Sequence, residues 1–151
     1  MFKKVYVPID NSDISNLILD DALQFAKSNN TALRVVHVVN LEQITFGIEM
    51  VGVIELKNTL IDIANKFLDH IKSKIAASGV NAEVALLENY GTDLASMLVD
   101  DASTWGADLF ILGNHHLGSF SHFITGGVVE SIAHHTIIPI LLITKHKKLK
   151  G

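Results

Sequence analysis

The sequence predicts an α/β domain built around a parallel sheet, and three observations support this. The chain has 151 residues, a common size for one domain, and a domain of that length buries roughly two-thirds of its unfolded surface. Short runs rich in valine, isoleucine and leucine alternate with longer segments whose apolar residues recur at three- and four-residue spacing. Several short runs are apolar throughout, which is typical of strands covered on both faces. We expect one domain over residues 1–151, with an open five-stranded parallel sheet and helices on both faces.

Five apolar runs are the predicted strands. The segments between them have helical spacing, and a helical crossover joins strands that run parallel to each other. The predicted strands are Lys4–Ile9, Ala32–Val39, Asn81–Leu87, Ala107–Gly113 and Ile138–Thr144.

The first helical segment follows the first strand. Ser12 stands where an N-cap side chain would accept a free backbone N–H, so we expect the helix to start just after Asp10. Apolar residues at helical spacing form the face that would pack on the sheet. These residues are Ile14, Leu17, Ile18, Ala22, Phe25 and Ala26.

A second, longer helix precedes the third strand. Its apolar residues span about five turns or more, and Gly79 is placed to take the left-handed conformation of a C-terminal cap. The apolar face consists of Leu60, Ile61, Ala64, Phe67, Leu68, Ile71 and Ile75. The preceding segment Leu41–Val53 fits neither period, and its Gly47, Met50 and Gly52 indicate a connection or an early helix turn.

Two further helices flank the fourth strand. One begins around Thr92 or Asp93 and ends by Gly106, and the other begins near Gly126 and Gly127. The apolar residues of the two helices are Leu94, Met97, Leu98 and Ala102 in one, and Val128, Val129, Ile132 and Ala133 in the other.

Composition and charge exclude several classes of protein. The chain has no cysteine, which excludes disulfides, thiolate metal sites and cysteine nucleophiles. Its net charge of −4 offers no basic stripe to a nucleic-acid backbone. The N-terminal apolar run ends at Asp10, too early for a signal peptide, and no run approaches a membrane span. We expect a soluble, cytoplasmic protein with neither a nucleic-acid nor a membrane partner.

Signatures of common catalytic classes are missing from the sequence. There is no phosphate-binding Gly-x-x-x-x-Gly-Lys-Ser/Thr loop, no nucleophile elbow, and no dinucleotide-binding glycine triplet after the first strand. The acidic pairs Asp20-Asp21 and Asp100-Asp101 lie in amphipathic helices, where a solvated face explains them. We expect no catalytic residues and no enzymatic role.

The carboxyl edge of the sheet is the expected ligand site. Helix N-termini there present unpaired N–H groups and the positive end of the helix dipole. Three segments converge on that edge: Pro8–Asp10, His37–Val39 and Gly113–Val128. The third segment is the most informative, because it contains glycines at both ends and histidines between them.

The segment Gly113–Val128 resembles the signature of the universal stress protein family, which reads Gly-x-x-Gly, nine residues, then Gly-Ser or Gly-Thr. Gly113 matches the first glycine and Gly126 the third, and His115 occupies a position where the family often has histidine. His116 replaces the second glycine, and Gly127 replaces the hydroxyl residue.

The resemblance extends over essentially the whole chain. It includes an Asp-x-Ser-x-x-Ser start at Asp10–Ser15, a His-Val strand end at His37-Val38 and a closing strand at Pro139–Ile143. It implies a Rossmann-like fold of the adenine nucleotide alpha hydrolase-like kind and a stress-response module that reversibly binds ATP, ADP or AMP, with Mg²⁺ if the ligand is a triphosphate. It also implies a homodimer in which Ile138–Ile143 pairs with its mate from another subunit.

The same resemblance implies roles for individual residues. Asp10 would hydrogen-bond the adenine, Val38 would pack near it, and Pro8 and Ile9 belong to the same candidate site. The residues that would line ribose and phosphates are Gly113, His115, Gly126, Gly127 and Val128, and His116 belongs to the same candidate site.

The departures from the signature predict weak binding. A lost hydroxyl-to-phosphate hydrogen bond is worth about 1.5–3 kcal/mol, or roughly a ten- to hundredfold drop in affinity. No lysine or arginine lies between Gly113 and Val129, so a phosphate there would depend on backbone N–H groups, the helix dipole and neutral histidines. We therefore expect modest binding of an adenine nucleotide instead of tight triphosphate binding.

Three alternatives remain open on sequence alone. The glycines can be ordinary turn residues, and Asp10 can be an acidic residue that stabilises the N-terminus of a helix. The chain would then be a nucleotide-free dimeric interaction protein whose nucleotide-binding motif has lost its function. The histidines His115, His116 and His122 share one loop and are a minor candidate for a metal site. His134 and His135 are better explained by the negative end of their helix.

Overall fold

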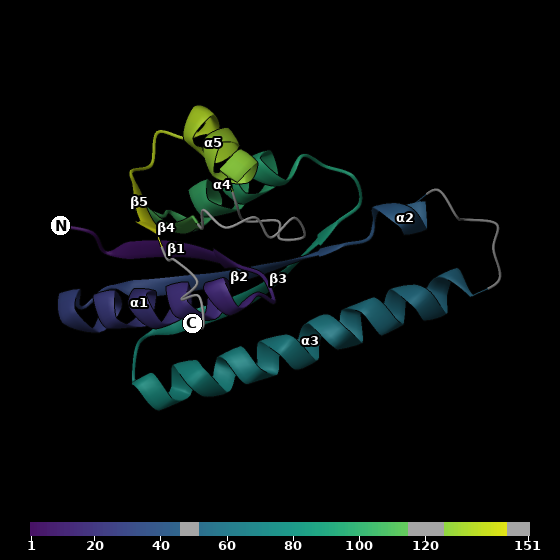
Figure 1. The fold of residues 1–151 in the computed structure, drawn as a ribbon, viewed down its shortest axis with the longest axis horizontal. Helices are drawn as coiled ribbons and strands as arrows, with labels where there is room; N and C mark the ends of the chain where they lie inside the picture. The colour runs from purple at the N-terminus through teal and green to yellow at the C-terminus, as the bar shows by residue number, and fades with distance from the viewer. Residues whose placement is uncertain (46–51, 115–125, 145–151) are drawn as a thin grey trace, which may run out of the picture.

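The computed structural model describes residues 1–45, 52–114 and 126–144. Within these ranges the strands form one sheet in the order β3-β2-β1-β4-β5, and every neighbouring pair is parallel (Figure 1). This confirms the predicted fold class. The elements are β1 (Lys4–Ile9), α1 (Asp13–Asn29), β2 (Ala32–Asn40), α2 (Glu42–Thr45), α3 (Val53–Ser78), β3 (Ala82–Asn89), α4 (Leu94–Trp105), β4 (Leu109–Asn114), α5 (Gly126–His135) and β5 (Ile140–Thr144).

The two faces of the sheet are covered by different helices. Figure 1 shows α1 and α3 on one face and α4 and α5 on the other. Side chains alternate along β1, so Val5, Val7 and Ile9 enter the core under α1 and α3. Tyr6 enters the opposite core with Phe110 under α4 and α5. Successive residues at the carboxyl edge therefore direct their side chains to opposite faces of the sheet, and a ligand on one face contacts only every second side chain of a strand.

The helix boundaries follow local signals that the sequence carries. The Ser12 side chain caps α1 by accepting the Ser15 N–H, and Asp93 caps α4 by accepting the Ser96 N–H. Gly79 and Gly106 end α3 and α4 with φ of 72° and 87°, a left-handed conformation that glycine adopts without strain. The capping predictions are confirmed. The ambiguous segment after β2 contains the short helix α2, which is the early helix turn that its sequence allowed.

The buried apolar face of α1 differs from the predicted one at three positions, Leu17, Leu19 and Leu23. Leu17 is 45% exposed, whereas Leu19 and Leu23 are buried. The observed stripe runs through Ile18, Leu19, Ala22, Leu23 and Ala26, and α1 contacts both β1 and β4. Leu17 therefore does not belong to the core.

The Asp100-Asp101 pair was expected on a solvated face, and this is wrong for Asp101. Its carboxylate accepts two hydrogen bonds from Arg34 at 3.0 Å and one from the Tyr6 hydroxyl at 2.7 Å. Arg34 also pairs with Glu83 at 3.1 Å. Burial, followed by the Asp101 carboxylate, raises the pKa of Tyr6, and the network ties α4 to β1 and β2. Periodicity alone missed this network because its members lie far apart in the sequence.

Candidate functional site

The candidate site is the crevice beyond the carboxyl ends of β1, β2 and β4. β1 pairs with β2 up to Ile9, which lies opposite His37, and Asp10 then leaves the sheet. β2 continues beside β3 until Asn40. The backbone of Val38–Asn40 is therefore paired by β3 on one side, while β1 no longer reaches it on the other. Free N–H and C=O groups of a strand edge can hydrogen-bond the edge of a flat polar ligand.

The side chains expected at this site divide between the two faces. Val38 and Val128 are partly buried against the core under α4 and α5, and Pro8 lies on that face by strand alternation from Tyr6. Ile9 does not share this face. Its side chain is 2% exposed and packs in the core under α1 and α3, so only its backbone can take part in a site with Val38.

A small cavity adjoins Val38 on the side toward β3. It has a volume of about 140 Å³ and is lined by Val38, Asn40, Asn89 and Leu94. The Asn89 Oδ1 accepts hydrogen bonds from the N–H groups of Gly91 and Thr92 at 3.0 and 2.8 Å. This fixes the turn that leads into α4 and forms one wall of the cavity.

Asn40, Asn89 and Leu94 were not predicted as site residues. The length of β2 is the signal that would have indicated them. Because β2 extends beyond the end of β1, Asn40 lies beside Asn89 at the end of β3.

The turn between β1 and α1 is closed by three buried hydrogen bonds. The Asp10 N–H donates to the Ser15 Oγ at 2.9 Å, the Ser15 N–H donates to the Ser12 Oγ at 3.0 Å, and the Ser12 N–H donates to the Asp10 Oδ1 at 3.0 Å. We call this ring the Asp10–Ser12–Ser15 cycle. All three residues are less than a tenth exposed. The cycle holds a buried carboxylate at the N-terminus of α1, where the helix dipole favours a negative charge.

His37 supports the same edge from the opposite face. Its Nδ1–H donates to the Ile9 carbonyl oxygen at 3.1 Å, and its ring packs edge-on against Phe67 with centroids 4.8 Å apart. Burial lowers the pKa of His37, and the Ile9 carbonyl and the Asp10 charge oppose that shift. His37 thus joins the ends of β1 and β2 to α3, and its burial favours the neutral form of the ring.

The two described ends of the glycine motif have different surroundings. A Cβ built on Gly113 would lie 2.6 Å from the Ile18 Cγ1, and Ile18 is 2% exposed. A Cβ built on Gly127, in the first turn of α5, would meet no neighbouring atom within 4 Å among the described residues. Gly126 is the first residue of α5. Gly113 thus allows close packing of α1 on β4, whereas no such packing against the described residues constrains Gly127.

Several predicted residues are not placed by these observations. His115 and His116 lie outside the described residues, as does His122 of the minor metal hypothesis. In the described part of the chain, no group of three or more histidine, aspartate or glutamate residues is arranged to hold a metal ion. His134 and His135 lie in the last turn of α5, and the His135 Nδ1 contacts the Ser131 carbonyl oxygen at 2.6 Å.

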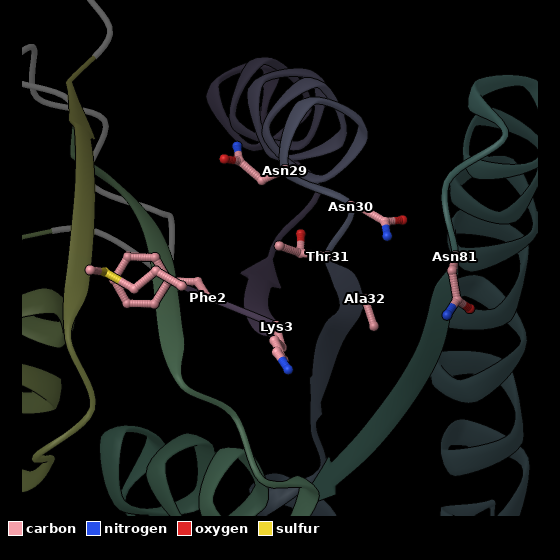
Figure 2. A pocket seen from close by; sticks show the side chains of 8 residues that line it. Phe2, Lys3, Asn29, Asn30, Thr31, Ala32 and Asn81 are labelled. Carbon is pink, nitrogen blue, oxygen red and sulfur yellow. The ribbon is translucent and has the colours of Figure 1, made fainter.

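A second hollow lies at the opposite edge of the sheet. Figure 2 shows Lys3, Thr31, Ala32 and Asn81, which surround a space of about 550 Å³ at the amino ends of β1, β2 and β3. The Thr31 Oγ1 is buried there without a hydrogen-bond partner among the described residues. In the described ranges, α1, α3 and α4 end at this edge, so it presents their C-termini and not the helix N-termini that make the carboxyl edge suited to anions. No helix within the described ranges is long and apolar enough to cross a membrane.

Comparisons with known proteins agree with the fold. A family model described as the universal stress protein family matches residues 1–144. The universal stress protein YxiE of Bacillus subtilis is 26% identical over 151 residues, which covers 95% of this chain and 99% of YxiE.

Solved structures show the same architecture. The structure of the hypothetical protein MJ0577 has a TM-score of 0.78 at 21% identity and covers 99% of both chains. A universal stress protein from Archaeoglobus fulgidus in complex with dAMP has a TM-score of 0.66 at 21% identity, covering 94% of this chain and 98% of that one. A universal stress protein in complex with cAMP has a TM-score of 0.59 at 21% identity, covering 95% and 97%.

Proposed function

This chain belongs to the universal stress protein family, and from that premise we propose that it reversibly binds an adenine nucleotide at the crevice beyond β1, β2 and β4. Two observations carry the proposal. Among the described residues, no strand pairs with Val38–Asn40 on the side toward β1, and the buried Asp10 directly follows Ile9, the last β1 residue that pairs with β2. Two proteins of the same fold are complexed with dAMP and cAMP, which both contain adenine.

The base end of the site matches the hydrogen-bonding pattern of adenine. The adenine edge carries a 6-amino donor beside a ring-nitrogen acceptor. A strand edge offers N–H and C=O groups, and a carboxylate accepts from an amino group. Apolar contact comes from Val38 and Leu94, which lie on one face of the sheet. The cavity of about 140 Å³ beside them would accommodate part of a planar base.

The phosphate end of the site would bind weakly. The first turn of α5 presents N–H groups and the positive end of its dipole, and Gly127 leaves room for a phosphate close to the backbone. No lysine or arginine occurs between Gly113 and Val129. We therefore propose modest affinity for ATP, ADP or AMP, with Mg²⁺ accompanying a triphosphate, and no catalytic role beyond slow, incidental hydrolysis.

We also propose that the chain forms a homodimer through β5. This strand ends the sheet and pairs with β4 on one side, and Leu141 and Leu142 are 38% and 44% exposed. An apolar edge strand of this kind pairs with a second copy or promotes aggregation. Nucleotide occupancy would then bias the contacts of the dimer with its protein partners. A dimer is expected in sedimentation at micromolar concentration, and a monomer alone would contradict this part of the proposal.

A nucleotide-free interaction protein is the second candidate. It is favoured by Gly127, which stands where the family signature has a hydroxyl residue, and by His116 in place of a glycine. Both substitutions remove features that would contribute to phosphate binding.

The test that separates the two candidates begins with the purified protein. Heat denaturation followed by mass spectrometry of the supernatant detects a co-purified nucleotide, and calorimetric titration with ATP and AMP measures affinity. We expect binding in the micromolar to millimolar range, weakened about tenfold or more in Asp10→Ala. Asp13→Ala is the matched control, because Asp13 is an exposed aspartate in the same turn. The absence of both co-purified nucleotide and binding at millimolar ligand would favour the nucleotide-free candidate.

A further inference from the structure

The Asp10–Ser12–Ser15 cycle leaves one oxygen of Asp10 uncommitted. Oδ1 accepts the Ser12 N–H at 3.0 Å, and Oδ2 has no hydrogen-bond partner among the described residues. Asp10 is only 6% exposed, so its carboxylate has little freedom to reorient. A fixed carboxylate with one free oxygen is an acceptor that points in a defined direction.

Ser15 is the member of the cycle that acts on the backbone of Asp10. Its Oγ accepts the Asp10 N–H at 2.9 Å across five residues of the chain. Ser12 has a different part, because its hydroxyl accepts the Ser15 N–H and caps α1. A serine near a helix N-terminus usually faces solvent or bonds within its own turn, but Ser15 is 8% exposed and bonds outward to the end of β1.

The loss of the Ser15 hydroxyl would act directly on the Asp10 turn. The Asp10 N–H would then be buried without an acceptor, which is unfavourable enough for the backbone to move toward another partner. The carboxylate is attached to the same residue and would move with it. Ile18 lies one turn further along α1 and is buried close to Gly113 of β4, and this packing resists a shift of the rest of the helix.

We propose that Ser15 is a positioning residue that sets the selectivity of the crevice for purines with a 6-amino group over purines with a 6-oxo group. This inference rests on the proposed nucleotide binding. A carboxylate accepts from the 6-amino group of adenine and repels the 6-oxo group of hypoxanthine. Selectivity of this kind requires the Asp10 oxygen to be held in place, and the Ser15 hydroxyl holds it.

The experiment compares ATP with ITP, which differ in having an amino or an oxo group at the 6-position. Calorimetric titration gives the affinity ratio for the wild type, Ser15→Ala, Ser15→Cys and Ser28→Ala. We expect ATP to bind at least about tenfold more tightly than ITP to the wild type. We expect that ratio to fall several-fold in Ser15→Ala and, less strongly, in Ser15→Cys, where a similar-sized thiol is a weaker acceptor. Ser28 is an exposed serine of α1, so its variant should keep the wild-type ratio.

The affinity ratio separates positioning from a purely structural role. If Ser15 only stabilised the fold, Ser15→Ala would weaken ATP and ITP binding equally and the ATP-to-ITP affinity ratio would stay at the wild-type value. That result would overturn the inference. An unselective wild type that still binds ATP would overturn the inference and leave the proposed function intact. Failure of the wild type to bind either nucleotide at millimolar concentration would overturn both. Asp10→Asn adds an independent reading, because an amide can donate to the 6-oxo group and should shift the preference toward ITP.

Discussion

The two sides of the crevice are constructed in different ways. On the β1 side the Asp10–Ser12–Ser15 cycle is buried and hydrogen-bonded, and Gly113 of β4 packs against Ile18 of α1. On the α5 side no described residue lies within 4 Å of the position that a Gly127 side chain would take. The comparison shows that the glycines of one motif serve different purposes. Gly113 allows α1 to pack closely on β4, whereas Gly127 lies where we propose that a phosphate binds.

The largest expected effect comes from filling the packed side. Gly113→Ala places a methyl group 2.6 Å from the Ile18 Cγ1, and Ile18 is buried and β-branched, so it cannot yield by rotating away. We expect a loss of about 1–3 kcal/mol in the free energy of unfolding, measured by urea denaturation. Gly127→Ala is the matched control and should be neutral or stabilising by up to about 1 kcal/mol. Equal destabilisation by both variants would contradict the distinction between the two glycines.

The second expected effect comes from filling the open side with a hydroxyl. Gly127→Ser should tighten ATP binding about tenfold, or about 1.4 kcal/mol, because a hydroxyl can donate to a phosphate oxygen. Calorimetric titration checks this, with adenosine as a ligand that lacks phosphate and should bind unchanged. Gly127→Ala controls for the loss of backbone freedom. Unchanged ATP affinity in the serine variant would show that no phosphate lies at this position.

The third effect concerns the cap of α1. Ser12→Ala removes the acceptor of the Ser15 N–H and should lower the free energy of unfolding by about 1 kcal/mol, as the loss of a serine N-cap usually does. Ser28→Ala, at an exposed position of the same helix, should have almost no effect on thermal unfolding. Comparable stability of the Ser12 variant and the wild type would mean that the cycle does not hold the β1 side together.

The smallest effect is a pH dependence of stability through His37. Burial lowers the pKa of His37 below its unfolded value of about 6.5, so the native state binds fewer protons than the unfolded chain. The contribution of the neutral ring is fully present above about pH 6.5 and is lost as the pH falls through the lowered native pKa. Urea denaturation between about pH 7 and 5 should show a shallower loss of stability in His37→Gln than in the wild type. His70→Gln, at an exposed position of α3, should keep the wild-type slope.

The fold was predictable from the sequence because its signals are local. The apolar runs predicted the strands, and both ends of β1 lie where they were predicted. Ser12, Gly79 and Gly106 predicted helix ends because their side chains or backbone conformations are suited to caps. Leu17 was misplaced because periodicity fixes the spacing of a helical face but not its rotation over two strands.

The candidate site was only partly predictable. The sequence predicted Asp10 and Val38 at the carboxyl edge. It did not show which face of the sheet the Ile9 side chain enters, because that is visible only in its core contacts. It also did not show that Asn40 lies at the site, because that depends on the unequal lengths of β1 and β2. The packing of Gly113 on Ile18 joins residues far apart in the chain, so no local pattern reveals it. Asp101 was misjudged for the same reason, because Arg34 and Tyr6 come from other elements.

The most direct test of the account is to map the nucleotide site residue by residue. Backbone amide NMR spectra recorded while AMP is added would identify which N–H groups sense the ligand. We expect the largest shift changes at Asp10, Val38 and Gly127, on both sides of the crevice, and little change at Thr31 and Asn81 at the opposite edge. Changes confined to that opposite edge, or none at millimolar AMP, would contradict the assignment of the crevice as a nucleotide site.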